Sequence, residues 1–210
     1  QVKWIASFYL FAPKPWQKTS PYKGTKYLLG LVYWLSQLPA FYIIKKYADI
    51  VFVTSQPDIK PFMTKHRGIK KIIPVRGGVD VLAAKQYFDQ EEFIPFENRN
   101  YDACFVGRFH YQKGVLELIR IWKVVCTKKP KCRLALIGIG PLEGEIQSLI
   151  KQMGLKPNIT LLGFLNGTEK FNVFKQSKIV LHPATYDSGG MAPAEAMAWG
   201  LPGVSFDLES

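Results

Sequence analysis

The fold class of this chain is decided by one stretch, Cys132-Arg-Leu-Ala-Leu-Ile-Gly-Ile-Gly-Pro-Leu-Glu-Gly-Glu-Ile-Gln-Ser-Leu-Ile-Lys-Gln-Met-Gly-Leu-Lys-Pro-Asn-Ile-Thr-Leu-Leu162. Residues 132–137 are a short, mostly apolar run that predicts a buried strand. A helix is predicted over 142–153, ended by Gly154. Residues 158–162 predict a second strand. This order indicates two parallel strands joined by a crossover helix.

The same alternation continues on both sides of this unit. Strands are predicted at 3–10, 49–55, 70–75, 101–106, 179–182 and 203–207, and helices at 56–66, 115–128, 168–176 and 191–199. Strands that alternate with helices indicate an α/β fold whose parallel sheets are covered on both faces.

A polar segment, residues 85–100, separates two halves of the chain and predicts a linker. We therefore expect one domain over residues 1–98, linker included, and a second over 99–210. The chain begins at Gln1 and ends at Ser210 just after a predicted strand. We expect it to be a piece of a longer protein, with both domains incomplete.

Positive charge is concentrated in the first quarter of the sequence. The formal net charge is +12, residues 1–48 hold seven lysines, and the first carboxylate is Asp49. Such a segment suits an anionic membrane surface, a phosphorylated substrate or a nucleic acid. The alternative is a basic face that is simply solvated.

An apolar run of 18 residues, 27–44, has no charged side chain and is flanked by Lys26 and by Lys45 and Lys46. Its length is at the lower limit for crossing a bilayer. Pro39 interrupts it. A buried helix, or a helix lying flat on an anionic membrane, is favoured over a membrane span.

The cysteines and histidines of the chain have no metal-ligand spacing. They are Cys104, Cys126, Cys132, His66, His110 and His182. We expect free thiols in a reducing compartment and no bound metal.

The first candidate binding site is the stretch Tyr186-Asp-Ser-Gly-Gly-Met-Ala-Pro-Ala-Glu195. It carries two carboxylates, Asp187 and Glu195, on either side of Gly189 and Gly190. Glycines let backbone N–H groups approach a ligand closely, and the N-terminus of the following helix attracts an anion. A site of this kind suits a diphosphate with hydroxyl-rich groups on both sides, which describes a nucleotide sugar.

A second candidate is the basic loop Gly107-Arg-Phe-His-Tyr-Gln-Lys-Gly114, which follows the strand 101–106 and leads into a helix. Arg108 can grip a phosphate with two hydrogen bonds, and Lys113 supplies a compact positive charge. Both would stabilise a leaving diphosphate. The alternatives are two solvated surface cations and, for Glu195, a solvated carboxylate near the start of a helix.

Other nucleotide-binding motifs are disfavoured. Gly138-Ile-Gly-Pro-Leu-Glu143 begins like a dinucleotide fingerprint, but Glu143 occupies the place of the third glycine. No glycine-rich Walker loop is present, which argues against a P-loop kinase.

The two motifs at 107–114 and 187–195, followed by Ala-Met-Ala-Trp-Gly-Leu-Pro, resemble the family 4 retaining glycosyltransferases of GT-B fold. Residues 48–55 and 73–80 resemble the junction between the two domains of that family. The resemblance covers nearly the whole chain. It implies two Rossmann-like parallel-sheet domains, both incomplete in this chain, and sugar transfer with retention of configuration.

The resemblance also implies roles for individual residues. Arg108 and Lys113 would hold the donor diphosphate, Asp187 would contact the transferred sugar, and Glu195 would bind the ribose. The substrate-binding residues that it adds are Gly107, Phe164, Leu165, Ser188, Gly189, Gly190 and Met191. The donor would be a UDP- or GDP-linked sugar, without a metal cofactor.

The N-terminal segment is basic and aromatic, so we expect the acceptor to be lipid-linked or close to a membrane. We expect the protein to be cytoplasmic and in peripheral contact with that membrane. Asp187 and Gly77 stand where the family usually has Glu and Asn, and Tyr9 where it often has His. Asp187 and the Tyr9 position leave open a nucleotide-sugar-binding protein with impaired catalysis. A nucleic-acid-binding module that uses the basic face is the other alternative, although no nucleic acid is expected as a partner.

Overall fold

The computed structural model describes residues 4–8, 14–16, 20, 22, 24–54, 59, 62, 71–75, 77–89, 94–185, 187 and 189–207. By their contacts these residues form two compact units. The first unit holds the described residues up to Gly78 together with Asp187 and Gly189, and the second holds those of 79–185 and 190–207. The predicted helix at 56–66 lies almost entirely outside the described residues.

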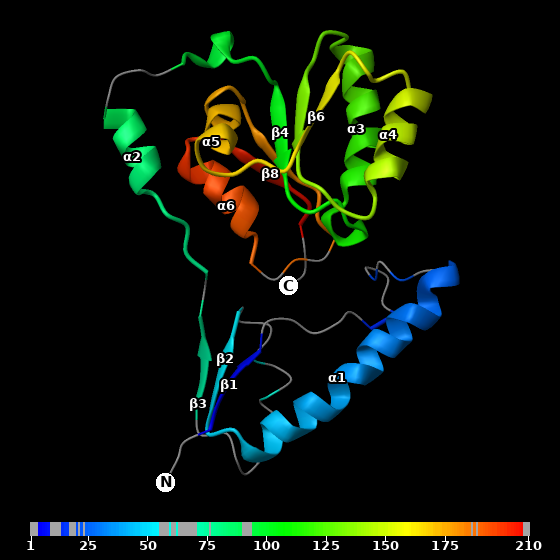
Figure 1. The fold of residues 1–210 in the computed structure, drawn as a ribbon, viewed down its shortest axis with the longest axis vertical. Coiled ribbons are helices and arrows are strands. Elements are labelled where there is room, and N and C mark those ends of the chain that lie inside the picture. Colours follow the sequence, from blue (N-terminus) through cyan, green and yellow to red (C-terminus); the bar gives the residue numbers. More distant parts are fainter. Residues whose placement is uncertain are drawn as a thin grey trace. The chain divides into compact units, whose positions relative to one another are not determined.

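The first unit contains a parallel sheet of three strands (Figure 1). Its elements are β1 (Ile5–Phe8), α1 (Tyr27–Tyr47), β2 (Ile50–Val53) and β3 (Lys71–Pro74), with strand order β1-β2-β3. Val51 and Val53 of β2 are fully buried and pack with Ala48 and Phe62. The central strand is therefore the apolar one, as expected for a strand with a neighbour on each side.

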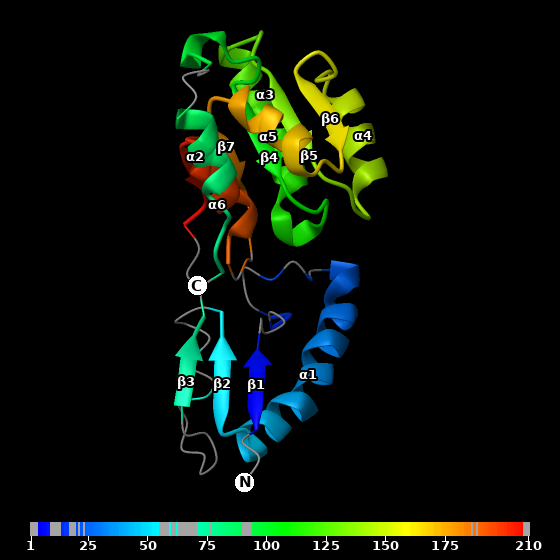
Figure 2. The same ribbon diagram turned by 60° about the vertical axis from the view of Figure 1, so that its left-hand side comes forward.

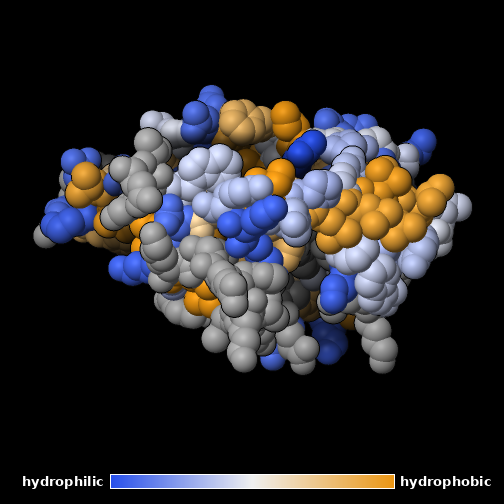
Figure 3. All heavy atoms as spheres, turned by 90° about the horizontal axis from the view of Figure 1, so that it is seen from below, coloured by the Kyte–Doolittle hydropathy of each residue, from blue (hydrophilic) through white to orange (hydrophobic). Residues whose placement is uncertain are grey.

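Helix α1 runs through Pro39 without ending and continues to Tyr47. Of its residues, only Gly30 is buried in the part of the chain that the structure describes. Large apolar side chains are exposed along its whole length: Tyr27, Leu28, Leu29, Val32, Tyr33, Leu35, Leu38, Tyr42, Ile43 and Tyr47. Some of this apolar surface is visible over α1 at the right of Figure 3. Among the described residues, nothing buries α1 over its length, so it is not the buried helix that was one of the two favoured interpretations of this run.

The second unit contains a parallel sheet of five strands, with the order β6-β5-β4-β7-β8. Its elements are α2 (Leu82–Asp89), β4 (Ala103–Val106), α3 (Val115–Lys128), β5 (Leu134–Ile137), α4 (Glu143–Gln152), β6 (Ile159–Gly163), α5 (Gly167–Lys175), β7 (Val180–His182), α6 (Met191–Ala198) and β8 (Gly203–Ser205). Figure 2 labels β4 to β7 of this sheet. Each strand pair is parallel. The α/β fold with parallel sheets is thus confirmed.

Both faces of this sheet are buried, and alternate residues of β4 belong to different cores. Ala103 and Phe105 belong to the core that includes α3 and α4, whereas Cys104 belongs to the core that includes α5 and α6. Successive side chains of a strand point to opposite faces, so an apolar run without alternation is what a doubly covered strand needs. The helices flank the sheet in two layers (Figures 1 and 2).

Helix α2 lies where composition predicts the start of a polar linker. Ala84 is buried in the core that holds α5 and α6, and the ring of Tyr87 lies 5.7 Å from that of Trp199. The Lys175 amine lies 4.2 Å from the centroid of the Tyr87 ring. These contacts group α2 with the second unit.

Candidate functional site

The order of the strands creates a switch point between β4 and β7. The chain proceeds from β4 to β5 and β6 on one side, then returns to the other side of β4 with β7 and β8. Ligands of open parallel sheets bind beyond the carboxyl ends of the strands at such a point. The two sequence motifs follow β4 and β7, which are neighbouring strands, so both motifs lie at this point of the sheet.

The basic loop 107–114 packs against the chain that leaves β7. The Thr185 N–H donates to the Gln112 carbonyl oxygen at 3.0 Å. Gly114 has a φ of 64°, and a Cβ added there would overlap the carbonyl oxygen of Pro183. A glycine is required at this position because it provides both the left-handed backbone and the room for Pro183. The contact brings the two loops together at the switch point.

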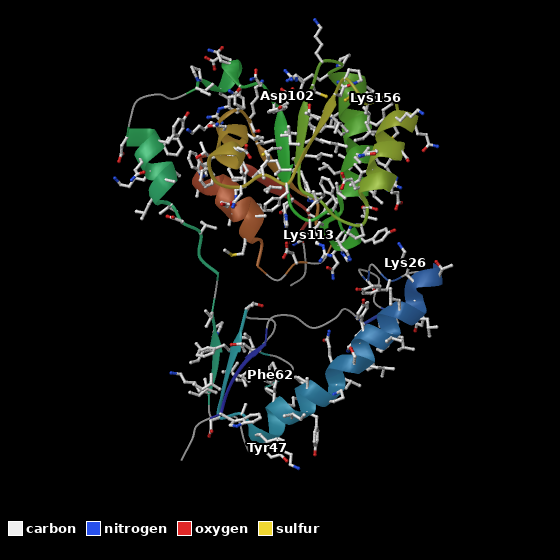
Figure 4. All side chains as sticks on the ribbon, viewed as in Figure 1. Lys26, Tyr47, Phe62, Asp102, Lys113 and Lys156 are labelled. Carbon is white, nitrogen blue, oxygen red and sulfur yellow. The ribbon has the colours of Figure 1, made fainter. Side chains whose placement is uncertain are left out.

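Arg108 and Lys113 lie on this loop, with Lys113 in the 3₁₀ turn that precedes α3. Arg108 is exposed, and its guanidinium makes no hydrogen bond or ion pair to another described residue. Lys113 is partly buried. Figure 4 shows Lys113 at the carboxyl ends of the strands and Asp102 at the opposite end of the same sheet. Both cations are therefore on the edge where a ligand of this fold is expected.

Glu195 lies in the second turn of α6, the helix that follows β7 and begins after Gly190. Both of its carboxylate oxygens accept hydrogen bonds from the Lys170 amine, each at 2.8 Å. The side chains of Lys170 and Glu195 are 15% and 26% exposed. The alternative of a solvated carboxylate is thus wrong, since Glu195 is held by a cation and is largely shielded from water.

Phe164 and Leu165 follow β6, at the same edge of the sheet as the basic loop because all strands are parallel. The Phe164 side chain is 69% exposed, whereas Leu165 packs partly against the core of α5 and α6. The two side chains therefore have different environments. The Phe164 ring is mostly exposed, whereas Leu165 is partly covered by the core.

The stretch from Asp187 to Glu195 is divided between the two units. Asp187 and Gly189 group with the first unit, and the Gly189 N–H donates to the Asp187 carboxylate at 3.4 Å. Gly190 and Met191 belong to the second unit, with Gly190 in the left-handed conformation (φ 55°) that begins α6. Ser188 lies outside the described residues. Of the predicted site, the second unit thus holds Gly107, Arg108, Lys113, Phe164, Leu165, Gly190, Met191 and Glu195.

Sequence reasoning missed Lys170 and the Pro183–Gly114 contact. No local pattern could have revealed Lys170, because it lies 25 residues before its partner Glu195. The three cysteines carry free thiols, and no cluster of three metal-ligating side chains occurs among the described residues. An open hollow of about 510 Å³ lies along α4 and β6, lined by Ser148, Lys151 and Lys156 among others, and contains none of the predicted site residues.

Comparison with known proteins identifies the family. The family described as "Glycosyl transferases group 1" matches residues 88–210, more than half of the chain. The chain belongs to this family of glycosyltransferases. The matched residues include every predicted site residue, from Gly107 to Glu195.

Two curated glycosyltransferases are similar to a longer part of the chain. The uncharacterised glycosyltransferase MJ1059 of Methanocaldococcus jannaschii is 30% identical over 178 residues, which are 81% of this chain and 43% of MJ1059. O-antigen chain mannosyltransferase C of Escherichia coli is 23% identical over 206 residues, 77% of this chain and 54% of that protein. The chain thus spans about half the length of these relatives.

Solved structures agree on the GT-B fold. Sucrose-phosphate synthase of Thermosynechococcus elongatus has a TM-score of 0.66 at 20% identity, over 98% of this chain and 50% of its own. The Anabaena protein HepE, solved with UDP and glucose, has a TM-score of 0.62 at 19% identity, over 96% and 52%. The two structural matches extend over both units of the chain.

Proposed function

We propose that the protein containing this chain transfers a sugar from a nucleoside-diphosphate sugar to an acceptor, with retention of configuration, as a member of family 4. One observation carries the proposal. The basic loop 107–114 contacts the exit of β7 at the switch point of the sheet, and Glu195 lies on the helix that follows. Cations and a carboxylate at this point match a diphosphate and a ribose, respectively.

The role of each residue follows from its chemistry. Arg108 and Lys113 hold the diphosphate and stabilise the charge that develops on it when the sugar leaves. Glu195 accepts hydrogen bonds from the ribose hydroxyls, and Asp187 contacts hydroxyls of the transferred sugar. The exposed Phe164 ring, with Leu165 beside it, faces the base, and the backbone of 188–191 lies near the phosphate and sugar.

The reaction needs no metal in this proposal, because Arg108 and Lys113 supply the positive charge. The bond from the anomeric carbon to the diphosphate oxygen breaks as the acceptor hydroxyl forms its bond on the same face. The acceptor proton passes to the departing diphosphate oxygen. A UDP- or GDP-linked sugar is the donor.

The acceptor of this proposal is lipid-linked or lies close to a membrane surface on the cytoplasmic side. Helix α1 supports this part, since large apolar side chains along it are exposed and Lys45 and Lys46 lie in its last turn. With the turn before it, Gly24–Tyr47 is long and apolar enough to cross a membrane, and 6% of its 18-residue apolar window is buried within the structure. Apolar and aromatic side chains flanked by lysines favour contact with anionic lipid.

The test is titration of the full-length protein with UDP, GDP and ADP by calorimetry, before and after Arg108→Ala and Glu195→Ala. Each substitution removes hydrogen bonds to a charged group, so the affinity for the preferred nucleotide should fall about 10- to 100-fold. The stereochemistry of the product, read by NMR, tests retention separately.

Arg120→Ala and Glu117→Ala are matched controls, because these two side chains pair with each other on the exposed face of α3. Both controls should bind nucleotide as the wild type does. Absence of nucleotide binding by the wild type, or wild-type binding by both site variants, would contradict the proposal.

A further inference from the structure

The Lys170–Glu195 pair joins two helices of the second unit at the predicted ribose-binding carboxylate. Lys170 comes from α5 and Glu195 from α6, and one amine reaches both carboxylate oxygens at 2.8 Å. Exposed ion pairs on protein surfaces are mobile and contribute little. This pair is different because both side chains are mostly buried, at 15% and 26% exposure.

The geometry fixes the carboxylate without using up its capacity to accept hydrogen bonds. A carboxylate has about four lone-pair directions on its two oxygens. Lys170 occupies one direction on each oxygen, which leaves one on each for another donor. Two neighbouring hydroxyl groups, as on the 2′ and 3′ carbons of a ribose, match that remaining pair.

Aromatic side chains support Lys170 on α5. Its amine lies 5.5 Å from the centroid of the Phe171 ring. That ring stacks on Trp199 at 4.6 Å between centroids, and Trp199 is almost fully buried. The lysine therefore extends from a packed part of the helix rather than from a mobile surface.

We propose that Lys170 is a positioning residue, which orients the Glu195 carboxylate so that its free lone pairs receive the 2′- and 3′-hydroxyls of the donor ribose. The inference rests on the proposed function, because it needs a nucleotide at this site. Without Lys170 the carboxylate can rotate away, and the protein then no longer distinguishes a ribose from a sugar that lacks these hydroxyls.

The experiment measures that distinction in the full-length protein. The probes are the nucleoside diphosphate that the wild type binds best, UDP or GDP, and its 2′,3′-dideoxy analogue, both by calorimetry. The wild type should prefer the ribonucleotide by about 10-fold or more. Lys170→Met should reduce the preference to about 3-fold or less, and Lys170→Arg should restore most of it.

Lys175→Met is the matched control on the same helix. The Lys175 amine faces the rings of Tyr87 and Trp199 rather than a carboxylate. This variant should keep the wild-type preference. Lys170→Gln replaces Lys170→Met if thermal unfolding shows that the methionine variant does not fold.

The outcomes separate the two proposals. A wild type that binds no nucleotide overturns the proposed function itself. If the wild type binds both probes equally, Glu195 does not recognise the ribose hydroxyls, and the proposed role of Lys170 is overturned. Unchanged preference in Lys170→Met, including an equal loss of affinity for both probes, leaves the proposed function intact and makes the lysine a structural contact only.

Discussion

Gly114 is the residue at which the two loops of the candidate site meet. Its φ of 64° is unfavourable for other residues, and its Cα faces the Pro183 carbonyl oxygen. An alanine there needs both a strained backbone and a displacement of Pro183. The same residue that allows the basic loop to turn therefore also fixes it against the exit of β7.

We predict that Gly114→Ala lowers the free energy of unfolding by about 2 kcal/mol or more, since backbone strain and overlap with Pro183 add together. Urea denaturation measures the loss, and nucleotide titration of the folded variant should show weaker binding.

Gly144→Ala is the control for this substitution. Gly144 lies in α4, has no neighbour within 4 Å of an added Cβ and is exposed. Alanine there should stabilise the protein by about 0.5–1 kcal/mol, because alanine favours the helix. A Gly114→Ala variant as stable as the wild type would mean that the loop contact is not rigid.

Among the elements, helix α1 departs furthest from an ordinary globular arrangement. Helices on the surface of a globular unit bury one apolar stripe. Within the described residues α1 buries only Gly30, and its large apolar side chains remain exposed over its length. Contact with lipid would remove these side chains from water.

We predict that the full-length protein floats with vesicles containing phosphatidylglycerol and that replacing Leu28, Leu29 and Val32 by glutamine weakens this binding. Replacing Lys26, Lys45 and Lys46 by glutamine should weaken it by about 1 kcal/mol for each lysine, and only for anionic vesicles. Flotation assays measure both effects.

Ile121→Gln with Val124→Gln is the control, because these residues are exposed apolar positions of α3 in the other unit. Flotation of this variant should equal that of the wild type. Equal flotation of the α1 variants would rule out α1 as the membrane contact.

Helix α2 shows how packing can override composition. Residues 85–100 contain charges, Pro95 and two asparagines, which is typical of a linker. Ala84 and Tyr87 nevertheless give α2 an apolar contact with the core around Trp199. A short helix with only these contacts is stabilised by its neighbour rather than by its own sequence.

At the scale of the whole molecule, the charge distribution tests the nucleic-acid alternative. The net charge of +12 is concentrated in the first quarter, whereas residues 100–210 hold 13 basic and 9 acidic side chains. In the second unit, Lys129 and Lys178 are paired with Asp102, and Lys170 with Glu195.

We therefore predict no tight complex with duplex DNA, with a Kd above about 1 µM near physiological salt, as for non-specific binding through phosphates alone. Fluorescence anisotropy with a labelled duplex at two salt concentrations measures this. A nanomolar complex whose affinity falls steeply with salt would favour the nucleic-acid alternative over sugar transfer.

The sequence alone predicted the parallel α/β fold, the helices α3 to α6 and the loops that carry Arg108, Lys113 and Glu195. These features depend on local periodicity, turn residues and the fixed relation between strand ends and loops. Only the tertiary structure decided that Lys170 holds Glu195, that Pro183 meets Gly114, that α2 joins the second unit and that α1 is exposed among the described residues. The first three features are contacts between residues far apart in the chain, and the fourth depends on which residues cover a side chain. A local sequence pattern predicts neither long-range contacts nor burial.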